Sequence, residues 1–415
     1  MREMKQAKNR NAIKRVIGIC ACIVVSIMTS QAQEIKDIDA LLAQEGFEDI
    51  QTKMVEDTLF AAFEDHSYRG TFRGAATAIK KVNEAHPEVE NFELVLTDYK
   101  MPQLIVHASK RGGIWDVSVD RQMKEALQKL KGVMPQAAST GKIDITFFPQ
   151  ITWINNKLDH VFDYIVRIAP AAAVTLWKGS RLTIQPILPL FNNLKDYDEN
   201  PDRYIQMGNT NLSQQLLSTK RWKATAAVGF FHPGRAGVHS NITFHALRNL
   251  DFYLEGGYTW EFKYTVDNGF RPTDGSQKFN FMAHASYYEP WSKVQVELQG
   301  GRFTYGDYGG RVDVTRHFAE YAIGVYGILT EGEHNFGFHF AIPFGGKRQK
   351  RNGYVRVRLP EYFTWNYSEK SNFKYALENM GKSYVTQPDQ NHSAHYWEPA
   401  FVEEYVERTL NGTFQ

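Results

Sequence analysis

The sequence has few features that would link it covalently or anchor it through helices. Its two cysteines, Cys20 and Cys22, both lie near the amino terminus, so the chain beyond them has no thiol for a disulfide or a thiolate metal site. No apolar run reaches the ~20 residues that a membrane-spanning helix needs. The hydrolase signatures HExxH and G-x-S-x-G are missing, and the histidines are scattered. We therefore expect a protein that is not an enzyme, with no catalytic residues, no metal and no cofactor.

The amino terminus has the three-part layout of a secretory signal peptide. Six Lys and Arg residues fall among the first 15, and an apolar run follows from Val16 to Met28. Ser30-Gln31-Ala32 then provides a small-x-small cleavage site. A membrane anchor is disfavoured because the run is shorter than a span, and a lipoprotein site at Cys22 would leave most of that run after the cysteine. The sequence predicts a signal peptide over residues 1–32, cleaved after Ala32.

Removing the signal peptide changes the charge balance. The 48 Lys and Arg residues fall to 42 and the 46 Asp and Glu residues to 45, which gives a formal charge of −3. Nucleic-acid binding domains are usually basic. We therefore expect no nucleic-acid partner.

One stretch, Asp251–Val266, alternates apolar and polar residues for sixteen positions. Its even-numbered side chains are mostly aromatic or aliphatic, whereas the other face carries Asp251, Glu255, Glu261 and Lys263. Successive side chains on a strand point to opposite faces, so this is a long strand with one apolar and one charged face. Soluble strands usually have ~5–6 residues, whereas a strand that crosses a membrane needs ~9–11. The pattern favours an outer-membrane barrel with a polar interior.

Similar strands recur from Lys142 onward. The clearest of the others alternate in the four stretches Lys278–Tyr287, Lys293–Gln299, Asn335–Phe344 and Tyr354–Leu359. With the less regular stretches they predict about 12–14 strands over residues 142–367. A soluble β-sandwich is the alternative, because its strands also have one apolar face. Long strands, Tyr and Trp at their ends and charges on their polar faces favour an antiparallel transmembrane β-barrel.

Two further regions flank the predicted barrel. Residues 33–135 predict a small α+β domain, with strands near 50–54, 58–63, 92–98 and 103–108 and helices over 72–84 and 119–130. Its place between the signal peptide and the barrel favours a periplasmic location, with the barrel in the outer membrane. Residues 368–415 form a tail whose segment Phe401–Leu410 predicts an amphipathic helix, acting as a lid or plug in the lumen or lying in the periplasm.

The segment Gly301–Phe318 carries the most specific motif. It has a Gly-Arg-aromatic start, an Asp-x-Gly step at Asp307–Gly309 and a Thr-Arg-x-Phe end at Thr315–Phe318. In this order the motif resembles the YjbH family of exopolysaccharide-associated outer-membrane proteins. The resemblance extends over the following hairpin and strand, and more loosely over Ala227–Glu261 and the amino-terminal region. It implies a part in exopolysaccharide production or secretion, as a conduit or as a docking platform for export partners, and it implies no catalytic residues.

Charged residues of these strands predict a network inside the barrel. A charge that faces lipid at the membrane midplane costs ~2–4 kcal/mol, so such groups should point inward or lie at the rim. The network would stiffen the wall by ion pairing, or contact a polysaccharide through paired hydrogen bonds of Arg and carboxylate groups. Its predicted members are Arg302, Asp307, Arg311, Asp313, Arg316, Glu255, Glu261 and Lys263.

The sequence leaves three functions open. The first is a role in exopolysaccharide production or secretion, and the second is a structural or adhesive barrel that recruits periplasmic partners. The third is an outer-membrane hydrolase of polysaccharide, but Glu255 and Glu261 are six residues apart on one strand, ~20 Å, whereas glycosidases place their carboxylates ~5–9.5 Å apart. The expected partners are outer-membrane lipid, an exopolysaccharide and periplasmic or lipoprotein export proteins.

Overall fold

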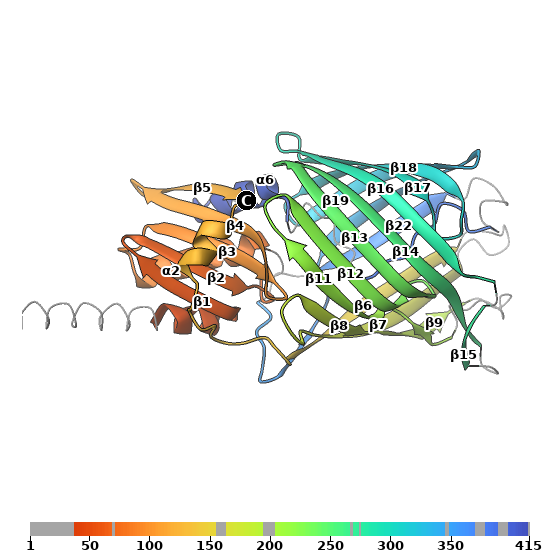
Figure 1. The fold of residues 1–415 in the computed structure, drawn as a ribbon, viewed down its shortest axis with the longest axis horizontal. Coiled ribbons are helices and arrows are strands. Elements are labelled where there is room, and N and C mark those ends of the chain that lie inside the picture. Colours follow the sequence, from red (N-terminus) through yellow and green to blue (C-terminus); the bar gives the residue numbers. More distant parts are fainter. Residues whose placement is uncertain are drawn as a thin grey trace, which may run out of the picture.

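The computed structural model describes residues 37–68, 71–154, 163–193, 204–265, 269–273, 275–344, 348–369, 378–388 and 397–413. A small α+β domain lies at one end of a large β-barrel (Figure 1). We call the barrel end that meets this domain the near end and the opposite end the far end. The predicted signal peptide lies outside the described residues.

The amino-terminal domain is a five-stranded sheet in the order β1-β2-β3-β4-β5. Neighbouring strands are antiparallel except β2 and β3, which are parallel and are therefore joined by a crossover helix, α2. The elements are β1 (Glu48–Val55), β2 (Thr58–Glu64), α2 (Thr71–Ala85), β3 (Asn91–Asp98), β4 (Met101–Arg111), β5 (Ile114–Asp120) and α3 (Lys124–Lys129). Helix α2 ends at Ala85 because Pro87 cannot continue it.

Helices cover both faces of this sheet. Helix α3 packs on one face through Ala126, beside Val95 and Ile105 of the sheet. Helix α2 packs on the other face together with α6 (Pro399–Leu410), the amphipathic helix predicted near the end of the chain. The carboxyl-terminal helix therefore completes the core of the amino-terminal domain, although it begins more than 300 residues after the end of α2.

The sequence did not predict strand β5, and it extended α3 too far. Trp115, Val117 and Val119 are buried and alternate with exposed neighbours, which is the pattern of an edge strand with one covered face. The hairpin that joins β4 to β5 turns through Gly112 and Gly113, whose φ angles of 57° and 86° suit glycine. Both the alternating pattern of β5 and the Gly-Gly turn before it can be read from the sequence.

The barrel is a large antiparallel sheet, as predicted, and its topology is closed. Its strands are β6 (Ile143–Ile154), β7 (Asp163–Val174), β8 (Ser180–Ile184), β9 (Pro186–Asn192), β10 (Gln206–Met207), β11 (Thr210–Ser218), β12 (Trp222–Phe231), β13 (Arg235–Leu247), β14 (Leu250–Thr265), β15 (Gly269–Pro272), β16 (Lys278–Glu289), β17 (Val294–Arg302), β18 (Tyr308–Phe318), β19 (Tyr321–Thr330), β20 (Glu333–Pro343), β21 (Val355–Arg358) and β22 (Tyr362–Glu369).

Several of these strands are halves of one interrupted strand. The segments β8 and β9 both pair with β7, with a register shift between Val166 and Arg167, and β10 and β11 continue one another along β9 and β8. Likewise β15 and β16 both pair with β14, while β21 and β22 flank Pro360 and face β6 and β20 respectively. The described strands thus occupy 13 positions, within the predicted range. Because this number is odd, the first and last strands run in the same direction, and β21 pairs with β6 in parallel.

The two faces of the barrel wall differ as the alternation in the sequence predicts. On β14, Leu254 is 63 % exposed on the outside, whereas Thr259 on the inside is fully buried. The same split holds on β18 and β19, where Val312 and Val325 face outward and His317 faces inward. The outer surface of the barrel is therefore apolar and its interior polar.

The domain covers the near end of the barrel. In the part of the chain that the structure describes, six strand connections lie at this end. Each connection, or a residue next to it, makes a polar contact to the domain or to α6. The barrel residues that make these contacts are Gly179, Ser218, Arg248, Lys293, Glu320 and Arg351.

No helix among the described residues is long and apolar enough to cross a membrane.

Candidate functional site

A row of ionisable side chains crosses the inner wall of the barrel. Glu255, His284, Glu297, Asp313 and His339 come from β14, β16, β17, β18 and β20, which are neighbours apart from β19 between the last two. Each occupies an inward position of its strand, because its sequence neighbours are the apolar residues of the outer face. We call these five residues the lumen row.

The first half of the lumen row is centred on His284. Its Nε2 lies 3.3 Å from Glu255, and its Nδ1 lies 3.2 Å from Glu297. The ring of Tyr253 stacks on the imidazole with centroids 3.9 Å apart, and its hydroxyl donates to Glu297 at 2.6 Å. Gln299 donates to the same carboxylate oxygen at 2.6 Å. His284 is thus fixed between two carboxylates, and Glu297 is the more tightly held of them.

The second half of the lumen row is centred on Asp313. Arg311 contacts one of its carboxylate oxygens at 2.6 Å, and His339 contacts the other at 2.9 Å. Thr315 donates to Asp313 at 2.9 Å, and the Arg311 guanidinium lies over the ring of Tyr326, 3.9 Å from its centroid. Asp313 is therefore surrounded by partners from two strands, β18 and β20.

The two halves meet at a pair of like charges. Glu297 and Asp313 stand directly opposite each other on β17 and β18. Cβ atoms of directly opposed residues are ~4.5–5.5 Å apart, and like charges in this arrangement are destabilising. The wall tolerates the pair because each carboxylate has its own cationic or donor partners.

A cavity of about 570 Å³ lies beside the lumen row. The side chains of the row line it together with Gln295, Gln299, Asn366 and Ser383. It reaches the far-end turn at His232 and Pro233. The arrangement can bind a polar molecule through many hydrogen bonds. The described residues contain no cluster of His, Cys, Asp and Glu that could hold a metal ion.

The carboxyl-terminal tail forms one side of this cavity. Tyr384 stacks on Phe231 and approaches His239 at 3.0 Å, while Val385 forms a β-bridge with His232. Gly381 donates its backbone N–H to Asp307 at 2.7 Å. The tail residues 378–388 thus lie inside the far half of the barrel, and α6 follows at the near end. A plug in the lumen was one of the positions predicted for this tail.

The structure brings three of the predicted network residues together. Glu255, Arg311 and Asp313 all line the cavity. Glu261 is on the inward face of β14 but lies outside the cavity lining, and the side chain of Lys263 lies outside the described residues. Asp307 is buried at the far end, where it accepts hydrogen bonds from Thr330 and Gly381 and so holds the tail.

The prediction that Arg302 and Arg316 belong to the lumen network is wrong. Arg316 is exposed on the outer face near the end of β18, where its guanidinium lies over the ring of Phe318. Arg302, the last residue of β17, pairs with outward-facing Tyr308 and packs against its ring. Since Arg311, Asp313 and Thr315 share the inner face, residue 316 must point outward. Both arginines lie at or near strand ends.

Three residues of the lumen row were missed from the sequence. His284, Glu297 and His339 stand at polar positions of strands whose alternation was recognised. Their shared inward direction was therefore available as a signal. Their proximity was not, because it depends on the register of five successive strand pairs.

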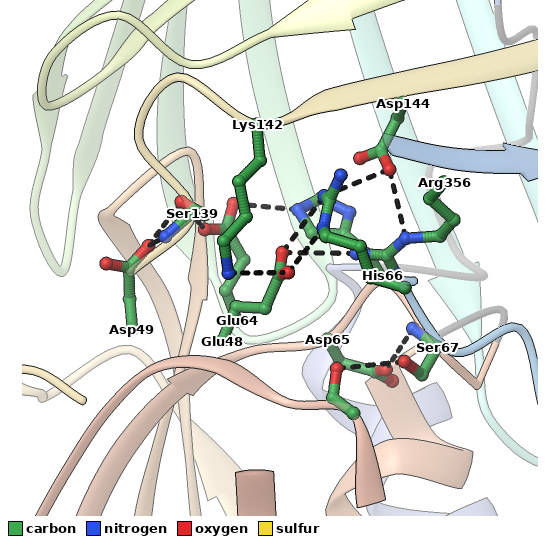
Figure 2. Close-up of polar contacts among 12 residues, drawn as sticks. Glu48, Asp49, Glu64, Asp65, His66, Ser67, Ser139, Lys142, Asp144 and Arg356 are labelled. Atoms are coloured by element: carbon green, nitrogen blue, oxygen red, sulfur yellow. Dashed lines mark hydrogen bonds and ion pairs between the residues drawn. The ribbon is translucent and has the colours of Figure 1, made fainter. Parts of the chain in front are cut away.

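A second buried cluster joins the domain to the barrel. Arg356 on β21 lies 3.1 Å from Glu48 of the domain and 2.9 Å from Asp144 on β6, and Figure 2 shows it beside both. Arg351 bridges the same two acids at 2.6 Å and 3.0 Å. Burial would raise the pKa of Glu48, but the arginines lower it below its usual range. We call Glu48, Asp144, Arg351 and Arg356 the junction network; it fixes the domain at the parallel seam of the barrel.

His66 lies beside the junction network and gives the domain a pH dependence. Burial would lower its pKa, but Glu64, 2.9 Å away, raises it to about 9. Burial raises the pKa of Glu64, so the pair holds its proton more tightly in the folded state than in the unfolded chain. We expect the contribution of His66 to be complete below the unfolded histidine pKa of about 6.5 and to be lost as the pH rises through about 9. Denaturant midpoints of the protein between pH 6 and 10 measure this.

Two substitutions control for other titrating groups. His66→Gln should flatten the loss of stability between pH 6.5 and 9, whereas His86→Gln, in the same domain but outside the junction, should leave it unchanged. A wild-type midpoint that rises over this interval would contradict the assignment.

Comparison with known proteins was made at three levels. Residues 3–346 match the family model described as "Exopolysaccharide biosynthesis protein YbjH". No curated protein matches. Among solved structures, Pseudomonas aeruginosa OccK2 (OpdF) aligns with a TM-score of 0.26 and 9% identity, over 49% of this chain and 61% of that one. The chain thus spans about three fifths of that protein, and a similarity this low carries no argument about function.

Proposed function

Because the chain belongs to the YjbH family of exopolysaccharide biosynthesis proteins, we propose that it serves exopolysaccharide production or secretion as a capped outer-membrane barrel. In this proposal the barrel is a docking platform for export partners, with its domain in the periplasm. The observation that carries the proposal is the set of contacts between the domain and all six described near-end connections. A barrel that is closed at this end presents a folded domain to periplasmic partners and offers no free passage.

The outer surface of the barrel supports a membrane location. Exposed aromatic side chains occur at both ends: Trp291, Phe318 and Tyr321 at the near end, and Tyr258, Trp260 and Tyr308 toward the far end. Aliphatic residues such as Ile323 and Val325 are exposed between them. An apolar band flanked by aromatic girdles is the arrangement of outer-membrane barrels. The short near-end turns resemble the periplasmic turns of such barrels, which supports the proposed periplasmic position of the domain.

The filled interior of the barrel favours the function of a docking platform and argues against an open conduit. The tail fills part of the far half, and side chains such as Arg235, buried at 2 % exposure, fill other parts of the lumen. Helix α6 and the domain then cover the near end. A polymer cannot pass in this state without displacement of both.

A gated conduit is the second candidate, and one observation favours it. The tail is held at the far end by separate polar contacts, among them Gly381 to Asp307 and Tyr384 to His239, and a single such hydrogen bond contributes only ~0.5–1.5 kcal/mol. A partner that moves the tail could therefore open the lumen. The proposal assigns no reaction to the protein.

Planar-bilayer conductance distinguishes the two functions. We expect the full-length protein to be nearly silent, because the domain and the tail block the ion path. Replacing residues 378–388 with a Gly/Ser linker of equal length keeps α6 attached but removes the tail contacts. This variant should conduct only in brief events while the domain remains in place.

Two results would count against the platform. Steady conductance of the full-length protein would show that the lumen is open at rest and would favour the conduit. Loss of exopolysaccharide secretion on linker replacement, with the domain still bound to the barrel, would make the tail itself part of transport.

A further inference from the structure

We infer that the cavity beside the lumen row binds a saccharide that carries free amino groups. The inference rests on the proposed function, which supplies the polysaccharide, and it names the chemical class that this barrel would recognise. The size of the cavity, about 570 Å³, falls within the ~300–1,000 Å³ of small-ligand sites.

The lining of the cavity is of mixed polar character, as recognition of a saccharide requires. Gln295, Gln299 and Thr315 offer amide and hydroxyl groups along the wall. Asn366 is exposed on β22, directly opposite His339 in the strand pairing, and Ser383 is exposed on the tail. The ring of Tyr384, one face of which stacks on Phe231, adds an aromatic group to the lining. A sugar ring needs hydrogen-bond partners around its edge and an apolar contact on its face, and this lining provides both.

Unfilled hydrogen-bonding capacity faces the cavity. His284 is held on both sides, with its Nε2 3.3 Å from Glu255 and its Nδ1 3.2 Å from Glu297. Tyr253, His284 and Gln299 all contact the same oxygen of Glu297, its Oε1. Within the described part of the chain, the other carboxylate oxygen is therefore available to a ligand. Because the Glu297 side chain is 20% exposed and lines the cavity, this second oxygen is positioned to accept a hydrogen bond from a polar ligand.

The charge balance selects the kind of saccharide. Glu255, Glu297 and Asp313 line the cavity, and Arg311, the one Lys or Arg residue of its described lining, is already paired with Asp313. The two histidines of the row are likewise in contact with these acids. An ammonium group gains from the excess of carboxylates, whereas a uronic acid would be repelled by them.

Access is from the far end. The cavity reaches the turn at His232 and Pro233, while the domain covers the other end of the barrel. In the proposed orientation the ligand therefore approaches from outside the cell. The tail residues Gly381, Ser383 and Tyr384 contribute to the cavity, so a bound saccharide would contact the plug directly.

Calorimetry on the full-length protein in detergent tests the inference with three soluble probes: a glucosamine tetramer, a neutral glucose tetramer and a galacturonic acid tetramer. We expect the amino tetramer to bind most tightly and the uronic acid tetramer not to bind. Glu255→Gln should weaken binding of the amino tetramer about tenfold, the equivalent of one charge-assisted hydrogen bond.

Glu261→Gln is the matched control, because Glu261 is on the same face of the same strand but outside the cavity lining. It should leave the affinity unchanged, and all variants should retain the heat-modifiable band of the folded barrel. Equal binding of the three tetramers, tighter binding of the acidic one, or equal loss in both Glu variants would overturn the inference. Saccharide binding and the conductance of the full-length protein are measured independently. Failure of this inference can therefore be distinguished from failure of the proposed function.

Discussion

Replacing Phe401 with alanine is expected to release helix α6 from the amino-terminal domain. Phe401 is fully buried, and its ring lies 6.0 Å from Phe72 of the domain and 6.1 Å from Tyr288 of the barrel. It therefore packs where domain, terminal helix and barrel meet. Truncation of a buried phenylalanine to alanine typically costs ~3–5 kcal/mol, a large part of the stability of a small domain.

Limited proteolysis and hydrogen exchange in detergent would measure the effect. In Phe401→Ala we expect cleavage within residues 399–410 and loss of amide protection in α2, while the barrel strands stay protected. Glu407→Ala serves as the control, because Glu407 is exposed on the same helix and its loss should change stability by less than ~0.5 kcal/mol. Protection of α6 in both variants would show that the helix is held by other contacts.

This variant also links the stability of the domain to the state of the lumen. Helix α6 follows the tail that lies in the barrel, so its release removes the near-end anchor of the plug. We expect more frequent opening events in bilayers for Phe401→Ala than for the control. If opening becomes more frequent, packing of α6 on the domain helps to keep the lumen closed, which is what the gated conduit requires.

The sequence predicted the wall of the barrel better than its contents. Alternation along β14 gave the outward position of Leu254 and the inward position of Glu255 directly, because strand geometry allows only two directions. The same rule places Arg316 outside, and the error there came from grouping charges by motif without regard to parity. The inward or outward direction of each side chain is thus set by its place in the alternation, and applying this rule to β18 would have placed Arg316 outside.

Three features could not be predicted from the sequence, because they depend on contacts between residues far apart in the chain. The lumen row requires the register of strand pairs from β14 to β20, and a shift by one residue would turn each of its side chains to the lipid. The packing of α6 on α2 joins segments more than 300 residues apart, and an amphipathic helix does not specify its partner. The course of the tail into the lumen is set in the same way, by contacts such as Gly381 to Asp307.

The second large effect is expected at the junction network, on replacing Arg356 with methionine. Arg356 is 2 % exposed and contacts Glu48 and Asp144, which would then keep Arg351 as a shared partner, with Lys142 3.5 Å from Glu48. Removing one partner of a buried ion pair costs up to ~3–5 kcal/mol, because the remaining charge stays buried with less compensation. We expect the domain to detach from the near end at a lower temperature, measured by protease access to the connecting residues 136–142 on heating.

A second substitution separates charge from packing in this test. Adding Glu48→Gln to Arg356→Met removes the uncompensated carboxylate and should restore part of the lost stability, whereas a loss caused by packing would not be restored.

Arg348→Ala is the control, since Arg348 pairs with Glu45 at a partly exposed site, and surface pairs are worth ~0–1 kcal/mol. Because the junction network is buried, salt should weaken the Arg348 contact and leave the Arg356 effect largely intact. If the double variant were less stable than Arg356→Met, the network would hold the domain by shape and not by charge.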